Sequence, residues 1–112
     1  GEVESDSSGS ALSYGDVDGD GLDDILIGAS KSSEAFTRSG KVYLMLASSL
    51  GSQSLISLAN ADYSFLGTQE EDVAGQDLSA TGDVNGDGKN DVVIGASNYA
   101  STGSVYVIMS EL

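Results

Sequence analysis

Short apolar runs separated by glycine, serine and aspartate recur along the chain, and no segment keeps a helical period over three turns. The runs ILIGA at 25–29 and VVIGA at 92–96 are each followed by a run with a central tyrosine, KVYLMLA at 41–47 and SVYVIMS at 104–110. Runs of about five residues that are rich in Val, Ile, Leu and Tyr and bounded by glycine are typical of strands in a β-meander. The pattern therefore predicts an all-β fold.

The segment that follows the first tyrosine-centred run is less regular. Residues 47–61 could form a helix, but Gly51 and five serines favour a loop with about one helical turn. Tyr63 and Phe65 then alternate with small or polar neighbours. This alternation predicts a fourth strand within 61–67.

The chain consists of two copies of one unit, spaced by about 67 residues. GDVDGDGLDDILIGAS at 15–30 returns as GDVNGDGKNDVVIGAS at 82–97. Four short strands per unit indicate antiparallel blades of a β-propeller, the first at 1–66 and the second, without its closing strand, at 67–112. Because two blades cannot close a ring and a sheet edge stays unpaired, we expect a piece of a longer chain or pairing with further copies through open strand edges.

An acidic loop lies in the same place in each copy, at 16–24 and 83–91. Its oxygen-bearing side chains stand at loop positions 1, 3, 5 and 9, and a glycine holds position 6. Alternate residues of a tight loop turn inward, and glycine takes the sharp turn that brings the carbonyl of position 7 to the same point. The spacing predicts one Ca²⁺ site in each loop. The predicted ligands are Asp16, Asp18, Asp20, the Leu22 carbonyl and Asp24 in the first loop, and Asp83, Asn85, Asp87, the Lys89 carbonyl and Asp91 in the second.

The two loops are not expected to be equal. Asn85 supplies an amide where the first loop has a carboxylate, which predicts weaker binding in the second loop. Without a cation, the four carboxylates of the first loop are expected to repel and to raise one another's pKa values. Asp23, at position 8, is expected to face solvent.

Other loops of similar composition are disfavoured. An EF-hand needs a bidentate carboxylate at position 12 and a helix after it, whereas Ile27 and Ile94 hold that position inside strand-like runs. Dockerin loops look alike but also lead into helices. Asp-Gly pairs can form a plain hairpin turn without metal, but repetition with the same offsets favours a metal-binding loop.

The amino-acid composition further limits the partners and the reactions that the chain can support. Eighteen acidic against four basic residues give a formal charge of −14, which disfavours nucleic acid and favours oxygen-loving cations as partners. The chain has no histidine and no cysteine, so it lacks the commonest general base, disulfides and thiol chemistry. No apolar run approaches the roughly 20 residues of a membrane span. The acidic start does not resemble a signal peptide, so we expect any secretion signal to lie outside this sequence.

The order of these motifs resembles a known family. FLG at 65–67, the acidic loop, IGAS and then GKVY or GSVY are similar to the FG-GAP repeat of integrin α-subunit β-propellers and of many bacterial secreted and surface proteins. The resemblance covers essentially the whole chain, although Ser30 and Ser97 stand where the family's GAP motif has proline. It implies that the loop residues at positions 1, 3, 5, 7 and 9 ligate Ca²⁺ between two strands.

The expected function is that of a calcium-stabilised, non-catalytic propeller segment in extracellular adhesion or assembly. Extracellular modules bind Ca²⁺ with affinities that are useless in a calcium-poor cytosol, so we expect a secreted or cell-surface location. The expected partners are Ca²⁺, neighbouring blades or copies of the chain, and an extracellular protein or glycan. The alternatives are a polysaccharide-processing enzyme, a carbohydrate-binding module, and a self-assembling unit that forms a ring or filament.

Several residues outside the loops invite a functional reading that we do not favour. Tyr43 and Tyr106 are expected to pack between blades. Phe36 beside Arg38, or Tyr99 in the second copy, could contact a partner, but the sequence gives little support for this. The acidic residues before the first strand of each copy are expected to be solvated; they are Glu4, Asp6, Glu70, Glu71 and Asp72.

Overall fold

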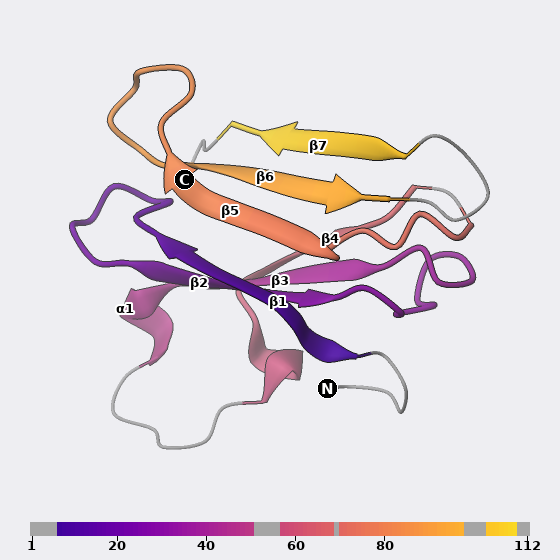
Figure 1. The fold of residues 1–112 in the computed structure, drawn as a ribbon. Helices are drawn as coiled ribbons and strands as arrows, with labels where there is room; N and C mark the ends of the chain where they lie inside the picture. The colour runs from indigo at the N-terminus through magenta and orange to yellow at the C-terminus, as the bar shows by residue number, and fades with distance from the viewer. Residues whose placement is uncertain (1–6, 51–56, 69, 98–102, 110–112) are drawn as a thin grey trace.

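A computed structural model describes residues 7–50, 57–68, 70–97 and 103–109. It contains two antiparallel sheets, one above the other in Figure 1, with strand orders β1-β2-β3-β4 and β5-β6-β7. The strands of the first sheet are β1 (Ser8–Gly15), β2 (Asp24–Ala29), β3 (Lys41–Met45) and β4 (Tyr63–Leu66). Those of the second are β5 (Asp77–Gly82), β6 (Asp91–Ala96) and β7 (Ser104–Ile108). The predicted all-β architecture is confirmed, with a four-stranded first blade and a three-stranded second blade.

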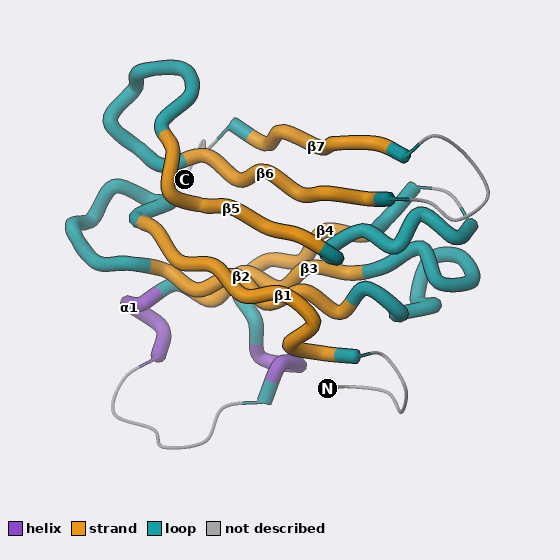
Figure 2. The backbone as a smooth tube through the Cα atoms, viewed as in Figure 1, coloured by secondary structure: helices purple, strands orange, loops and turns teal. Residues whose placement is uncertain are grey.

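Among the residues that the structure describes, helical structure is confined to the connection between β3 and β4. The short helix α1 (Ala47–Leu50) follows β3, and the 3₁₀ turn η1 (Leu58–Asn60) precedes β4; both are purple in Figure 2. This agrees with the predicted loop, although residues 51–56 lie outside the described part. Within the described residues, no helix has the length and apolar character needed to cross a membrane.

Strand register relates the two blades residue by residue. Directly opposed residues in antiparallel strands share one face of the sheet, so the pairs define equivalent faces. In each blade, the face that carries the residue pairs named in the next sentence is called the A face, and the opposite face is called the B face. The A face pairs are Leu26 with Leu44 and Gly28 with Val42 in the first blade, and Val93 with Val107 and Gly95 with Val105 in the second.

The hydrophobic core lies between the A face of the first blade and the B face of the second. Leu26, Val42 and Leu44 pack there in one cluster with Val92 and Ile94. Fully burying side chains of this size contributes about 1.5–3 kcal/mol each. The two blades therefore share a single core, and each covers one face of the other.

Candidate metal centre

The first acidic loop, between β1 and β2, is closed by the carboxylate of its first residue. Asp16 Oδ1 accepts hydrogen bonds from the N–H groups of Gly19 at 2.8 Å and Asp20 at 3.1 Å, and Oδ2 accepts one from Gly21 at 2.9 Å. Gly21 has φ +88°, the left-handed conformation that the glycine at position 6 was predicted to adopt. The N–H groups of three successive residues thus converge on one side chain.

The carboxylates at positions 3 and 5 form shorter-range contacts. Asp18 Oδ1 accepts from the Asp20 N–H at 3.3 Å, and Asp20 Oδ1 accepts from the Leu22 N–H at 2.9 Å. Asp20 and Leu22 both lie in the exposed tip of the loop. The loop backbone is therefore held by its own carboxylates at successive positions.

Asp24, the first residue of β2, is fully buried at 0% exposure. Its Oδ2 accepts from the Val17 N–H at 2.9 Å and its Oδ1 from the Ala47 N–H, also at 2.9 Å. These bonds offset the cost of burying a charge. Asp24 thereby ties the acidic loop to β2 on one side and to the start of α1 on the other.

Three of the predicted ligands in the first loop converge. Asp16, Asp18 and Asp24 each place a carboxylate oxygen so that all three lie within 4.8 Å of one another. Oxygens that share one Ca²⁺ at 2.3–2.6 Å lie at most about 5 Å apart, and an ionised carboxylate has about four lone-pair sites, so hydrogen-bonded oxygens can still ligate. The three residues fit Ca²⁺. Asp20 lies outside this group.

The second acidic loop repeats the same hydrogen bonds. Asp83 Oδ1 accepts from Gly86 at 2.9 Å and Asp87 at 3.2 Å, and its Oδ2 accepts from Gly88 at 2.8 Å. The remaining bonds are from Asp87 to Asn85 Oδ1 at 3.4 Å, from Lys89 to Asp87 Oδ1 at 2.9 Å, and from Val84 to Asp91 Oδ2 at 2.9 Å. Like Asp24, Asp91 is buried. Matching sequence at matching offsets has therefore produced matching loops.

The two loops differ at position 3. Asn85 offers an amide oxygen where Asp18 offers a charged one. Within the described part of the chain, the group of three acidic side chains at ligand spacing occurs in the first loop. The charge available to a cation is accordingly greater there.

The pKa values of the carboxylates in the first loop depend on hydrogen bonds from backbone N–H groups as well as on repulsion between the carboxylates. Burial favours the neutral form of Asp16, but the N–H groups of Gly21, Gly19 and Asp20 outweigh it and lower the pKa of Asp16. Burial is the main cause that raises the pKa of Asp18, with repulsion from Asp24 and Asp20 added, against a lowering bond from the Asp20 N–H. The prediction that the carboxylates raise one another's pKa values thus holds for Asp18 and is wrong for Asp16.

The equivalent carboxylate of the second loop behaves like Asp16. The N–H of Gly88 is the largest cause that lowers the pKa of Asp83, and the N–H groups of Asp87 and Gly86 add to it against opposing desolvation. Both first-position carboxylates are therefore stabilised in the charged form, which is the form that ligates metal.

The two acidic loops are in direct contact. They lie at the same end of the two sheets in Figure 1, and the Asn90 N–H donates to the Asp16 backbone carbonyl at 2.9 Å. A Cβ added to Gly19 would lie 3.1 Å from Lys89 Cγ, so the lysine stem covers the first loop. A change at one loop can therefore reach the other through a single hydrogen bond.

Comparison with known proteins agrees with this geometry. The FG-GAP repeat model matches residues 8–45 and 74–108, which contain both acidic loops and six of the seven strands. The chain belongs to the FG-GAP repeat family. It is also 34% identical over 104 residues to the protein "Integrin alpha pat-2" of Caenorhabditis briggsae, covering 93% of this chain and 8% of that protein. This FG-GAP chain thus spans a small part of the relative that it matches.

One hydrogen-bonded group around a buried carboxylate was not predicted from the sequence. Asp72 was expected to be solvated, but it is 1% exposed and accepts a hydrogen bond from the Tyr106 hydroxyl at 2.5 Å. Thr68 donates to the same Asp72 oxygen from its N–H at 3.1 Å, and its hydroxyl lies 2.8 Å from that of Tyr106. The recurrence of aspartate and tyrosine in both copies was the available signal, but only folding brings them together.

The other side chains that the sequence singled out have mixed outcomes. Arg38 forms an ion pair with Glu71 at 2.8 Å, so its charge is partly neutralised within the chain. Phe36 is exposed. Asp23 and Glu70 are exposed, as expected. Glu4, Asp6 and Tyr99 lie outside the described residues.

Proposed function

We propose that this FG-GAP chain is a calcium-binding, calcium-stabilised segment of an extracellular β-propeller that serves adhesion or structural assembly and is not an enzyme. The observation that carries the proposal is the convergence of three carboxylate oxygens within 4.8 Å in a loop whose hydrogen bonds recur in the second copy. The similarity to an integrin alpha protein supports an adhesive role at the cell surface.

The residues explain why a cation would stabilise the fold. Asp16, Asp18 and Asp24 hold like charges close together, and a bound Ca²⁺ would supply the positive charge that removes this repulsion. Asp24 also connects the loop to α1 through Ala47, so the loop, β2 and the following connection would be held as one unit. Asp83, Asn85, Asp87 and Asp91 would act in the same way in the second blade.

Assignment of ligands beyond the converging group follows the loop template. We assign Asp20 and the Leu22 carbonyl to the first site and the Lys89 carbonyl to the second, with the exposed loop tips closing on the ion when it binds. The two sites, one in each blade, would differ in affinity because Asn85 carries no charge.

The proposal is tested by melting the protein after complete removal of divalent cations and then with added Ca²⁺ or Mg²⁺. A ligand that binds only the folded state stabilises by about 2.7 kcal/mol per site at one hundred times its Kd, which for a domain of this size raises Tm by about 10 °C or more. Mg²⁺ prefers a tighter octahedral shell and is expected to do less. An unchanged Tm with Ca²⁺ would contradict the proposal.

A further inference from the structure

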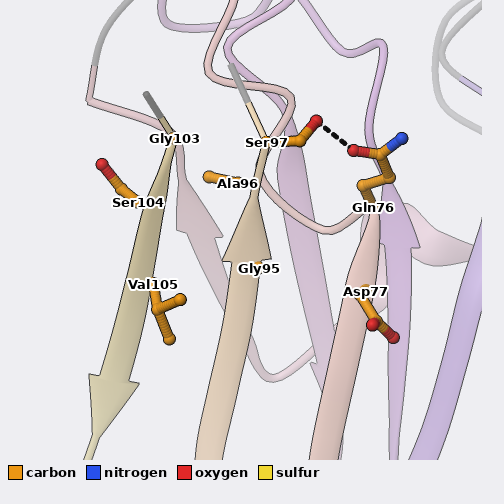
Figure 3. A pocket seen from close by; sticks show the side chains of 8 residues that line it. All are labelled: Gln76, Asp77, Gly95, Ala96, Ser97, Gly103, Ser104 and Val105. Atoms are coloured by element: carbon orange, nitrogen blue, oxygen red, sulfur yellow. Dashed lines mark hydrogen bonds between the residues drawn. The ribbon is translucent and has the colours of Figure 1, made fainter. Parts of the chain in front are cut away.

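The end of the second sheet away from its acidic loop carries an open hollow of about 630 Å³. In Figure 3, Asp77 and Val105 lie on the strands to either side of Gly95, and a hydrogen bond between Ser97 and Gln76 lies at one end. Ligand pockets have similar volumes, so the volume alone does not identify the occupant.

The first blade shows what occupies the equivalent position. Strand register makes Gly28 the counterpart of Gly95, and Val42 the counterpart of Val105. In the first blade, the backbone of Gly75, at the end of the segment Val73–Gly75, lies on this spot so closely that a Cβ on Gly28 would be 2.1 Å from the Gly75 carbonyl oxygen. A glycine–glycine backbone contact, and not a small molecule, fills the place.

The chain also carries a second segment with the backbone conformation of Val73–Gly75. Ser7–Gly9 occupies the same place in the first copy as Val73–Gly75 in the second. Ser7 and Val73 have φ 58° and 57°, and Gly9 and Gly75 have φ 88° and 91°. A Cβ on Gly9 would meet no described atom within 4 Å. The segment is thus formed in the docking conformation without being docked.

The sheet faces show the same complementarity. On the A face, Val42 and Leu44 are buried at 0% and 1% exposure, whereas their counterparts Val105 and Val107 are 68% and 50% exposed. Since the B face of the second blade covers the first pair, the surface that fits the second pair is another B face.

An exposed B face is present in the first blade. Leu12 is 67% exposed there, and Tyr14 and Ile25 beside it are also exposed. Tyr43 and Met45, on the outer strand of the same face, are already buried within the chain. The surface available for docking therefore centres on β1 and β2.

We propose that the bare A face of the second blade and its hollow bind a second copy of this chain head to tail. The second copy places its Ser7–Gly9 segment on Gly95 and packs its Leu12 side against Val105 and Val107, repeating the contact that the two blades make within one chain. Such a heterologous contact leaves a free face at each end, so copies add until they form a ring or continue as a filament. The proposal does not rest on calcium binding or on an adhesive role.

The formal charge of −14 on each copy opposes the contact, so the test is made in about 0.5 M salt with Ca²⁺ present. The mass of the 112-residue chain is measured by sedimentation equilibrium between about 10 µM and about 1 mM, the range in which a modest interface assembles. We expect the weight-average mass to rise steadily above 11.3 kDa. A monomer at every concentration overturns the proposal.

Gly95→Ala distinguishes an effect on docking of the second copy at Gly95 from an effect on the stability of the monomer. The nearest atom to the new Cβ is Asp77 Cβ at 3.4 Å, an ordinary contact, so the monomer should melt like the parent. In a docked pair the same methyl would clash as one on Gly28 would, and association should weaken at least about tenfold. If a folded Gly95→Ala protein associated as strongly as the parent, the proposed docking of the second copy on Gly95 would be contradicted.

Mixing two blocked variants tests the polarity of the contact. Val105→Asp blocks the A face of one protein, and Leu12→Asp blocks the B face of the other; both positions are exposed, so both variants should fold. Each alone should be monomeric, and a mixture should form dimers and stop there, because each pair has one intact A face and one intact B face. Larger assemblies in the mixture, or no dimers, would contradict head-to-tail docking.

Discussion

The three strands that both blades share have equivalent register, and the two acidic loops have equivalent hydrogen bonds, but the blades differ in what covers them. Val17 in the first acidic loop is 2% exposed, whereas its counterpart Val84 is 58% exposed. The same holds for the A faces, where Val42 is buried and Val105 is open. Equivalent sequence therefore sets the local structure, but burial is decided by the neighbouring blade. Matched substitutions in the two blades can separate these contributions.

The largest difference is expected at the paired glycines. Gly28→Ala places a Cβ 2.1 Å from a backbone oxygen, which cannot move without displacing the second blade, whereas Gly95→Ala makes only ordinary contacts. We expect Gly28→Ala to lower the free energy of unfolding by about 3 kcal/mol and Gly95→Ala to change it by less than about 0.5 kcal/mol. Urea denaturation of dilute protein with saturating Ca²⁺ measures both. Equal losses would show that the blades do not pack as described.

The valines of the acidic loops provide the next contrast. Val17→Ala removes two methyl groups from the shared core and should cost about 2 kcal/mol, whereas Val84→Ala should cost less than about 0.5 kcal/mol. The same urea titration compares them. If both were nearly neutral, the first loop would not be covered by the second blade.

The hydrogen bond between buried Asp72 and half-buried Tyr106 gives a smaller effect that depends on pH. Tyr106→Phe removes a hydrogen bond to a buried carboxylate, and we expect a loss of about 1–2 kcal/mol at neutral pH. Burial, and then the contact with Asp72, raise the pKa of Tyr106 above 10.0, so the unfolded chain releases this proton first. The stability contributed is complete below pH 10 and is lost as pH rises through the folded pKa.

Unfolding free energies measured from pH 7 to 12 test this expectation. The parent should lose more stability than Tyr106→Phe across the alkaline range, so the two curves should converge. Parallel curves would mean that Tyr106 does not titrate against Asp72, and a matched Tyr63→Phe variant, at an exposed tyrosine, controls for general alkaline unfolding.

The smallest difference concerns calcium affinity at loop position 3. Exchanging the residues, with Asp18→Asn in one variant and Asn85→Asp in another, should weaken the first site and strengthen the second by about tenfold each, because the charge of the ligand set tunes affinity. Calorimetric titration measures each constant. The contact from Asn90 to Asp16 should make the two sites affect each other, so their changes need not be additive.

Much of the local structure could be predicted from the chain itself. The repeated spacing identified both loops, and the requirement for a sharp turn placed glycine at Gly21, where φ is indeed positive. Glycine-bounded apolar runs located the strands. These features depend on residues that are close in sequence, so the sequence alone was sufficient to predict them.

Contacts between distant residues could not be predicted in the same way. Buried Asp72 accepts a hydrogen bond from Tyr106, 34 residues away. The lowered pKa of Asp16 has a local cause, but it depends on how the N–H groups of its own loop point, which residue spacing does not fix. The bond from Asn90 to Asp16 joins loops from two different blades. The Asp72–Tyr106 contact follows from the folding of the second blade and the Asn90–Asp16 contact from the packing of one blade on the other, and periodicity encodes neither.

A calorimetric titration of the metal-free protein counts the Ca²⁺ ions that the two acidic loops bind. We predict two sites in the parent and one each in Asp16→Ala and Asp83→Ala, with the exposed Asp23→Ala variant unchanged as the matched control. Absence of binding, a single site in the parent, or equal loss in Asp23→Ala would contradict the claim that each blade holds a calcium ion in its acidic loop.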